Sequence, residues 1–160
     1  MIKYVDTQIV FSEIPEEITL AINISNCWFH CPKCHSAWLQ QDIGKDLTLG
    51  TLDQLIQKHV AGITCVCFMG EGDFDQKYIN ARARFIKQHY PKLKVGLYTG
   101  RAVFPPGLDL IHFDYVKIGP YNEKRGPINK PTTNQRLYKV VNGYIADITY
   151  LFWKHKKLKT

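Results

Sequence analysis

Residues 18–36 read ITLAINISNCWFHCPKCHS, and this stretch determines the kind of fold to expect. Its first part, Ile18–Ile24, is apolar and β-branched, which predicts a buried strand. Three cysteines follow at once, at Cys27, Cys31 and Cys34. The cysteines are therefore expected on the loop that leaves the carboxyl end of this strand.

The rest of the chain repeats the pattern of a strand, a polar or glycine-rich loop and a helix. We expect further strands at Ile63–Met69, Val95–Tyr98 and Tyr115–Ile118, and helices at Leu52–Val60 and Asp75–His89. This alternation is typical of βα units in an α/β protein. Because a complete eightfold barrel needs ~250 residues, the chain is expected to form a partial, open (β/α) barrel with a mostly parallel, curved sheet.

Two later segments depart from this repeat. Residues 119–136 (GPYNEKRGPINKPTTNQR) are polar and rich in Pro, Gly and Asn, which predicts a long loop. Asn142 and Gly143 lie between two apolar segments, which predicts a C-terminal β-hairpin over about residues 137–148.

Composition and charge indicate the compartment and the partners to expect. The N-terminal residues lack a signal-peptide pattern, and the most apolar stretch is too short to span a bilayer, so we expect a single cytoplasmic domain over residues 1–160. The net charge is +7, but the basic residues are scattered except in a tail at residues 154–160. We expect this tail to be solvated, with no membrane or nucleic-acid binding. An acidic or nucleotide-rich partner is the alternative.

The spacing Cys-x3-Cys-x2-Cys in the loop 26–36 favours a metal site over disulfides in a reducing cytosol. Three thiolates can hold one [4Fe–4S] cluster and leave one iron free for a small molecule. The two remaining cysteines, Cys65 and Cys67, are two residues apart on a predicted strand, so they share a face and are expected to be buried.

Other kinds of metal site stay open on spacing alone. A structural zinc ion takes four ligands, and His30 or His35 would complete a Cys3His set. Such a protein would be a binding module without enzymatic activity, and its basic tail would suit nucleic acid. A ferredoxin normally uses four cysteines for each cluster, so the three closely spaced cysteines favour the open iron–sulfur site.

The cysteine loop resembles that of the radical S-adenosylmethionine superfamily, and Cys34-His35-Ser36 resembles the activating enzymes of glycyl radical enzymes. Further motifs follow in a similar order: CVCFMGEGD at 65–73, GLYTG at 96–100, VKIGPY at 116–121, PTTNQR at 131–136 and NGYIADIT at 142–149. Together they resemble the activating proteins of anaerobic ribonucleoside-triphosphate reductase over nearly the whole chain.

This resemblance implies a radical SAM oxidoreductase that reductively cleaves S-adenosyl-L-methionine at a [4Fe–4S] cluster. The 5′-deoxyadenosyl radical then takes hydrogen from a backbone glycine of the reductase, leaving a glycyl radical. The implied partners are the catalytic subunit of that reductase and a low-potential electron donor such as flavodoxin or ferredoxin. An activating enzyme for another glycyl radical enzyme, or a radical enzyme acting on a small molecule, is the alternative.

The resemblance also implies roles for individual residues. The cluster ligands are Cys27, Cys31 and Cys34, with no catalytic residue beyond them. The implied contacts with S-adenosylmethionine are Lys33, Cys34, His35, Gly70, Glu71, Gly72, Asp73, Thr99 and Lys117. Either Glu71 or Asp73 would balance the amino group of the methionine. From the residues alone, GEGD is also consistent with a turn that caps the next helix.

Aromatic residues and the long loop complete the expected site. Trp28 and Phe29 are expected to shield the cluster from water or to form a rim for the partner. The loop 119–136 is a candidate docking element for the reductase, because of its length and polarity.

Overall fold

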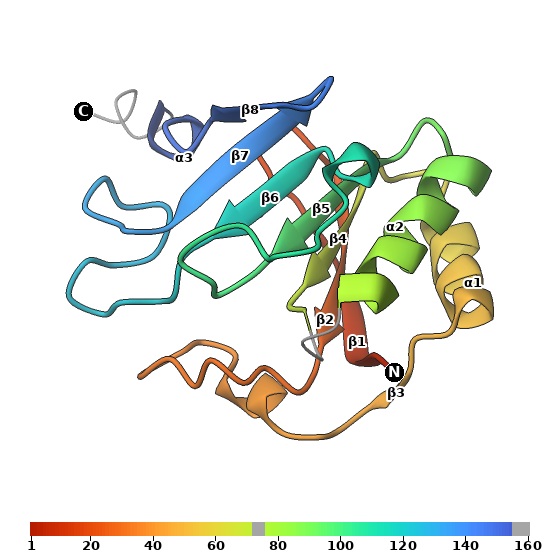
Figure 1. Ribbon diagram of the computed structural model, residues 1–160, viewed down its shortest axis with the longest axis horizontal. Helices are drawn as coiled ribbons and strands as arrows, with labels where there is room; N and C mark the ends of the chain where they lie inside the picture. The colour runs from red at the N-terminus through yellow and green to blue at the C-terminus, as the bar shows by residue number, and fades with distance from the viewer. Residues whose placement is uncertain (72–75, 155–160) are drawn as a thin grey trace.

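The computed structural model describes residues 1–71 and 76–154, which form one mixed sheet of eight strands with helices packed against it (Figure 1). The elements are β1 (Lys3–Val10), β2 (Thr19–Ile24), β3 (Lys45–Asp46), α1 (Leu49–His59), β4 (Cys65–Met69), α2 (Gln76–His89), β5 (Lys94–Tyr98), β6 (Tyr115–Ile118), β7 (Arg136–Val141), β8 (Tyr144–Asp147) and α3 (Leu151–Lys154), with 3-10 turns at Ala37–Gln40 and Leu110–His112. The strand order is β3-β1-β2-β4-β5-β6-β7-β8.

The centre of the sheet is parallel and its two flanks are antiparallel. Strands β2, β4, β5 and β6 are parallel neighbours. Strands β3 and β1 on one side, and β7 and β8 on the other, pair antiparallel. The α/β class is therefore confirmed. The expected mostly parallel sheet is wrong for the sheet as a whole, because three of the seven pairings among the described strands are parallel.

The missed strand β1 explains much of this difference. Its residues are half-buried or exposed and alternate only weakly between polar and apolar, so they give a faint strand signal. The strand nevertheless pairs with β2 along most of its length, from Tyr4 opposite Ile24 to Val10 opposite Thr19. The chain therefore begins with an antiparallel strand beside the first parallel one.

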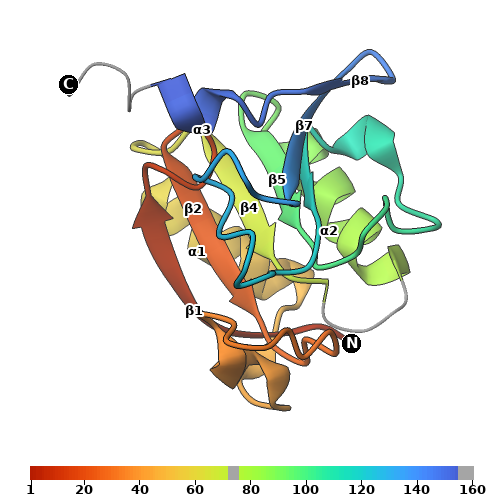
Figure 2. The same cartoon turned by 90° about the vertical axis from the view of Figure 1, so that its left-hand side faces the viewer.

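The two faces of the sheet are covered differently. Helices α1 and α2 lie on one face (Figures 1 and 2), where they pack on every second side chain of the central strands. The core on this face contains Leu20, Ile22, Ile24, Val66, Phe68, Val95, Leu97 and Val116 from the strands and Leu52, Ile56, Ile79, Ala83 and Ile86 from the helices. The opposite face carries a smaller cluster of Ile14, Cys65, Cys67, Tyr115 and Leu137. The segment between β6 and β7 crosses this second face (Figure 2).

Local signals account for the helix boundaries. The hydroxyl of Thr48 accepts a hydrogen bond from the Thr51 N–H at 3.0 Å, so helix α1 begins at Leu49, before the predicted start at Leu52. Helix α2 ends at His89 as predicted. Its predicted first residue, Asp75, lies outside the described residues.

The C-terminal part also follows the sequence. Asn142 has a φ of 50° and Gly143 a φ of 79°, the left-handed pair that a two-residue hairpin turn between β7 and β8 requires. Residues 119–135 contain neither helix nor strand, which confirms the predicted long loop. Most of the predicted basic tail, residues 155–160, lies outside the described residues. In the described part of the chain, no helix is long and apolar enough to cross a membrane.

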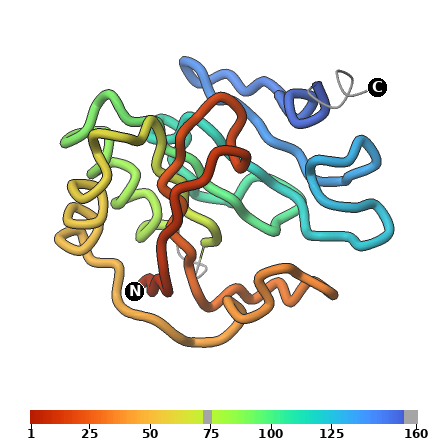
Figure 3. Tube along the Cα trace, turned by 180° about the vertical axis from the view of Figure 1, so that it is seen from behind, coloured from red at the N-terminus to blue at the C-terminus, as the bar shows by residue number. Residues whose placement is uncertain are grey.

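The carboxyl ends of the four parallel strands meet at one edge of the sheet. The cysteine loop follows β2, Gly70 and Glu71 follow β4, Thr99 follows β5 and Gly119 follows β6. Viewed from behind, the chain after β2 runs along this end of the molecule (Figure 3). Parallel α/β proteins hold their ligands at this edge, so the fold gathers the motifs of the sequence where a site is expected.

Candidate functional site at the carboxyl edge of the sheet

Four side chains, one from each parallel strand, form the floor of the candidate site. The register places Asn23 beside Met69, Met69 beside Tyr98, and Tyr98 beside Lys117. All four face away from α1 and α2, because their neighbours along each strand face the helices. This strand-end row lines a cavity of about 170 Å³, called here the cysteine cavity.

The three loop cysteines line the same cavity. Cys27, Cys31 and Cys34 are half-buried free thiols, and all three contribute to its wall. Within residues 1–71 and 76–154, no group of three or more His, Cys, Asp or Glu side chains is arranged to hold a metal ion. The donor set itself suits an iron–sulfur cluster, since three soft thiolate ligands on one loop face one cavity.

The cysteine loop has an unusual backbone. Asn26, His30 and Lys33 have φ values of 62°, 46° and 57°, in the left-handed region that side chains other than glycine rarely adopt. Such residues persist where surrounding contacts fix them, and they gather at functional sites. One such contact is the Cys27 N–H, which donates to the Leu39 carbonyl at 2.9 Å.

A second contact holds the loop against the end of β5. A Cβ atom placed on Gly100 would lie 2.9 Å from two ring atoms of Phe29, so glycine at this position permits the close approach. Phe29 lines the cysteine cavity, whereas Trp28 is 42% exposed and lies against Phe29 with ring centroids 4.6 Å apart. Phe29 is thus positioned to exclude water, while Trp28 contributes to the outer rim.

Burial shifts the pKa values of two side chains that line the cysteine cavity. Burial raises the pKa of Cys27, and the Phe29 N–H opposes this by bonding to the sulfur. Burial lowers the pKa of Lys117 to about 8, and the proximity of Cys31 and Cys34 opposes that shift. The cavity therefore combines thiol groups with a buried amine.

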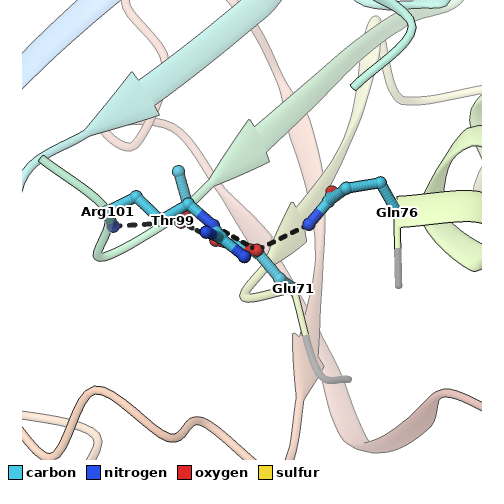
Figure 4. Close-up of polar contacts among 4 residues, drawn as sticks. All are labelled: Glu71, Gln76, Thr99 and Arg101. Atoms are coloured by element: carbon cyan, nitrogen blue, oxygen red, sulfur yellow. Dashed lines mark hydrogen bonds and ion pairs between the residues drawn. The ribbon is translucent and has the colours of Figure 1, made fainter. Parts of the chain in front are cut away.

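Glu71 forms the centre of a buried polar network next to the cavity (Figure 4). Its carboxylate accepts hydrogen bonds from Gln76 Nε2 at 2.8 Å, from Arg101 Nε at 2.9 and 3.0 Å, and from the Thr99 hydroxyl. The ion pair with Arg101 is almost fully enclosed. The network fixes the ends of β4 and β5 against each other, and it compensates a charge that would be costly to bury alone.

Not all of the predicted contact residues lie together. Gly70, Thr99 and Lys117 line the cysteine cavity with the three cysteines, whereas Glu71 is turned toward Arg101. Gly72 and Asp73 lie outside the described residues. Arg101 was not predicted, because its partner is thirty positions away and no local pattern indicates the contact.

Lys33 and His35 contact the long loop. The Lys33 ammonium pairs with Glu123 at 2.7 Å, and the rings of His35 and Tyr121 lie 5.4 Å apart. These contacts connect the cysteine loop to residues 119–135. The cysteine loop and the long loop therefore lie side by side and contact each other at these residues.

A larger cavity of about 1000 Å³ adjoins the cysteine cavity, and we call it the outer cavity. It shares Cys34 and three members of the strand-end row with the cysteine cavity. Its outer walls come from Ser12 and Glu13, from Tyr121, Pro127, Ile128 and Asn129 of the long loop, and from Phe152. A chain segment or small molecule held there would lie next to the cysteine loop.

The two histidines of the cysteine loop have other partners. His30 Nδ1 lies 3.0 Å from Gln40 Oε1, and His35 packs against Tyr121. Neither belongs to a four-ligand group with the thiols in the described structure.

Comparison of the chain with protein-family models, with curated proteins and with solved structures finds no match. What the fold and the site define is an α/β protein with a cysteine loop at the carboxyl edge of its parallel strands.

Proposed function

We propose that the chain is a radical S-adenosylmethionine activating enzyme, one that generates a glycyl radical on anaerobic ribonucleoside-triphosphate reductase. The observation that carries this proposal is the position of Cys27, Cys31 and Cys34. All three line one cavity above the ends of four parallel strands. In this proposal, β2, β4, β5 and β6 are the strands of a partial (β/α) barrel, and the antiparallel strands extend it on both sides.

The residues of the cysteine cavity would divide the work between binding and exclusion of water. The three thiolates would hold a [4Fe–4S] cluster, which supplies the electron that cleaves the sulfonium of S-adenosylmethionine. Phe29 and Leu39 line the same cavity and would keep solvent away from the thiolates. Gly70 and Thr99, at the ends of β4 and β5, line the same cavity and would contact S-adenosylmethionine.

We propose Asp73 as the acidic partner of the methionine amino group, because Glu71 is engaged elsewhere. Glu71 is already compensated by Arg101, Gln76 and Thr99. A carboxylate engaged in this way gains less from a further ammonium group. This favours Asp73, which lies outside the described residues, for the contact with the amino group.

The outer cavity is the proposed entry for the glycine-bearing segment of the reductase. It adjoins Cys34, and one wall is the long loop, which we propose as the docking element. A substrate segment lying there would reach the site without entering the helical core on the opposite face of the sheet.

The test is an anaerobic preparation followed by metal analysis and a cleavage assay. We expect a brown protein with ~4 iron atoms for each chain, which forms 5′-deoxyadenosine when reduced with S-adenosylmethionine. A variant with Cys27, Cys31 and Cys34 all replaced by Ala should lose both the iron and the cleavage. A colourless zinc protein without cleavage would contradict the proposal and would support a zinc-binding module.

The partner is tested separately. Purified reductase incubated with the reduced protein and S-adenosylmethionine should show a glycyl radical signal in electron paramagnetic resonance. If S-adenosylmethionine is cleaved but no glycyl radical appears, the assignment to the radical S-adenosylmethionine superfamily would stand, and the reductase would be rejected as the partner. A variant with residues 123–130 replaced by a short Gly-Ser linker should cleave S-adenosylmethionine yet bind the reductase more weakly. Unchanged reductase binding would reject the docking role of the loop.

A further inference from the structure

Lys117 is a buried charge in an exceptional position. It is 8% exposed, and among residues 1–71 and 76–154 it is the only buried lysine or arginine. It belongs to the strand-end row and lines both the cysteine cavity and the outer cavity. Two other cations near the site are paired with carboxylates, Lys33 with Glu123 and Arg101 with Glu71.

The contacts of Lys117 do not compensate its charge. Its ammonium donates to the Gly119 carbonyl at 3.2 Å and lies 5.4 Å from the centre of the Tyr98 ring. In the described part of the chain, no carboxylate forms an ion pair with it. A buried ammonium with so little compensation is costly to the fold unless negative charge lies nearby.

The groups around Lys117 indicate which charge is missing. Cys27, Cys31 and Cys34 line the cysteine cavity together with Lys117, and Glu13 lies at the wall of the outer cavity. Three of these four are the cysteines of one loop. Lys117 is also the only cation in the described lining of the cysteine cavity. The amine is therefore placed to face whatever anionic group the three thiolates hold.

We propose that Lys117 is a positioning charge that raises the reduction potential of an iron–sulfur cluster held by Cys27, Cys31 and Cys34. This inference rests on the proposed function. Reduction adds one electron from the external donor to the cluster, with no bond formed or broken. A fixed positive charge in a site with little water stabilises the more negative, reduced form. The lysine would thus make the cluster easier to reduce.

The test is a potentiometric titration of the reconstituted protein, followed by electron paramagnetic resonance of the reduced cluster. Replacing Lys117 with Met removes the charge and keeps a similar length. We expect the ratio of reduced to oxidised cluster at a fixed potential to fall about tenfold, which corresponds to ~59 mV for one electron. Lys117→Arg should keep the ratio within about threefold of the wild type.

Lys139→Met is the matched control. Lys139 is an exposed lysine on β7 and lines neither cavity. Its replacement should leave the potential unchanged. An effect on the potential equal to that of Lys117→Met would overturn the inference, because it would show that the net charge of the protein matters more than the place of the lysine.

The remaining outcomes each decide the inference. A loaded Lys117→Met protein with an unchanged potential overturns it and leaves the proposed function intact. A folded Lys117→Met protein without iron also overturns it, since the lysine would then be needed to assemble the site. If Lys117→Met does not fold, Lys117→Gln takes its place, and failure of both would assign Lys117 to the fold alone. A wild-type protein without a cluster overturns the proposed function as well.

Discussion

The five cysteines fall into two groups with opposite surroundings. Cys27, Cys31 and Cys34 are half-buried at the wall of a cavity, on a loop with three left-handed residues. Cys65 and Cys67 are fully buried on β4, in an apolar cluster on the sheet. Burial raises the pKa of both strand thiols. The same side chain is thus a thiol at a cavity wall in one place and a small apolar packing group in the other.

The largest difference between the two groups should appear in iron binding. Replacing Cys65 and Cys67 together with Ala should leave the iron content and the cleavage of S-adenosylmethionine within about twofold of the wild type, because neither thiol lines a cavity found at the site. Replacing Cys31 alone with Ala should remove most of the iron. Metal analysis of anaerobically reconstituted protein measures both. Equal iron loss in the two variants would break the distinction.

The next difference is in thiol reactivity. At pH 8, iodoacetamide should modify the loop thiols of the metal-free protein on the order of 100-fold faster than Cys65 and Cys67, because only an accessible thiolate reacts. Since burial raises the pKa of the strand thiols, they should stay protonated and unmodified at pH 9 as well. Within the loop, Cys27 should react slowest, because burial raises its pKa. Mass spectrometry of digested samples over time gives the individual rates.

A smaller effect should separate the packing around the two groups. A methyl group on Gly96 would lie 2.8 Å from Ile14 Cδ1 and 3.1 Å from Cys67 Sγ, so Gly96→Ala should lower the free energy of unfolding by about 2 kcal/mol. Gly100→Ala would instead press on Phe29 of the cysteine loop. This variant should lower the free energy of unfolding by less than Gly96→Ala does. It should, however, change the rate at which iodoacetamide modifies the loop thiols. Urea unfolding and alkylation of both variants measure this. If Gly100→Ala lowered the free energy of unfolding more than Gly96→Ala, the packing of the cysteine loop would matter more for stability than the packing around β4.

The sequence predicted the parts of the fold that depend on local signals. The four parallel strands, the two long helices and the hairpin at Asn142 and Gly143 all lie where apolar pattern, caps and turn residues indicate. The burial of Cys65 and Cys67 is confirmed too. The antiparallel strand β1 was missed because its residues are half-buried or exposed and alternate weakly between polar and apolar. In addition, an alternating pattern does not show that β1 pairs with β2.

The gathering of the three loop cysteines at one place could be predicted from the sequence, but the contacts between distant segments could not. The spacing of the cysteines is a local feature, and the structure places all three at one cavity. The contact between Lys33 and Glu123 joins residues ninety positions apart, and no local pattern indicates it. Lys117 was placed by resemblance near the nucleotide. Its isolation as a buried cation depends on the register of β5 and β6 and on the path of the cysteine loop.

The enclosed pair of Glu71 and Arg101 has a consequence for how this chain can change over generations. Replacing either residue alone leaves the other charge buried without a partner. Breaking a buried pair in this way typically lowers the stability of the fold by about 3–5 kcal/mol. Losing both at once is far milder, because two neutral side chains of similar volume can fill the space. The two positions are therefore expected to be inherited as a unit, and among descendants of this sequence an altered acid should come with an altered base.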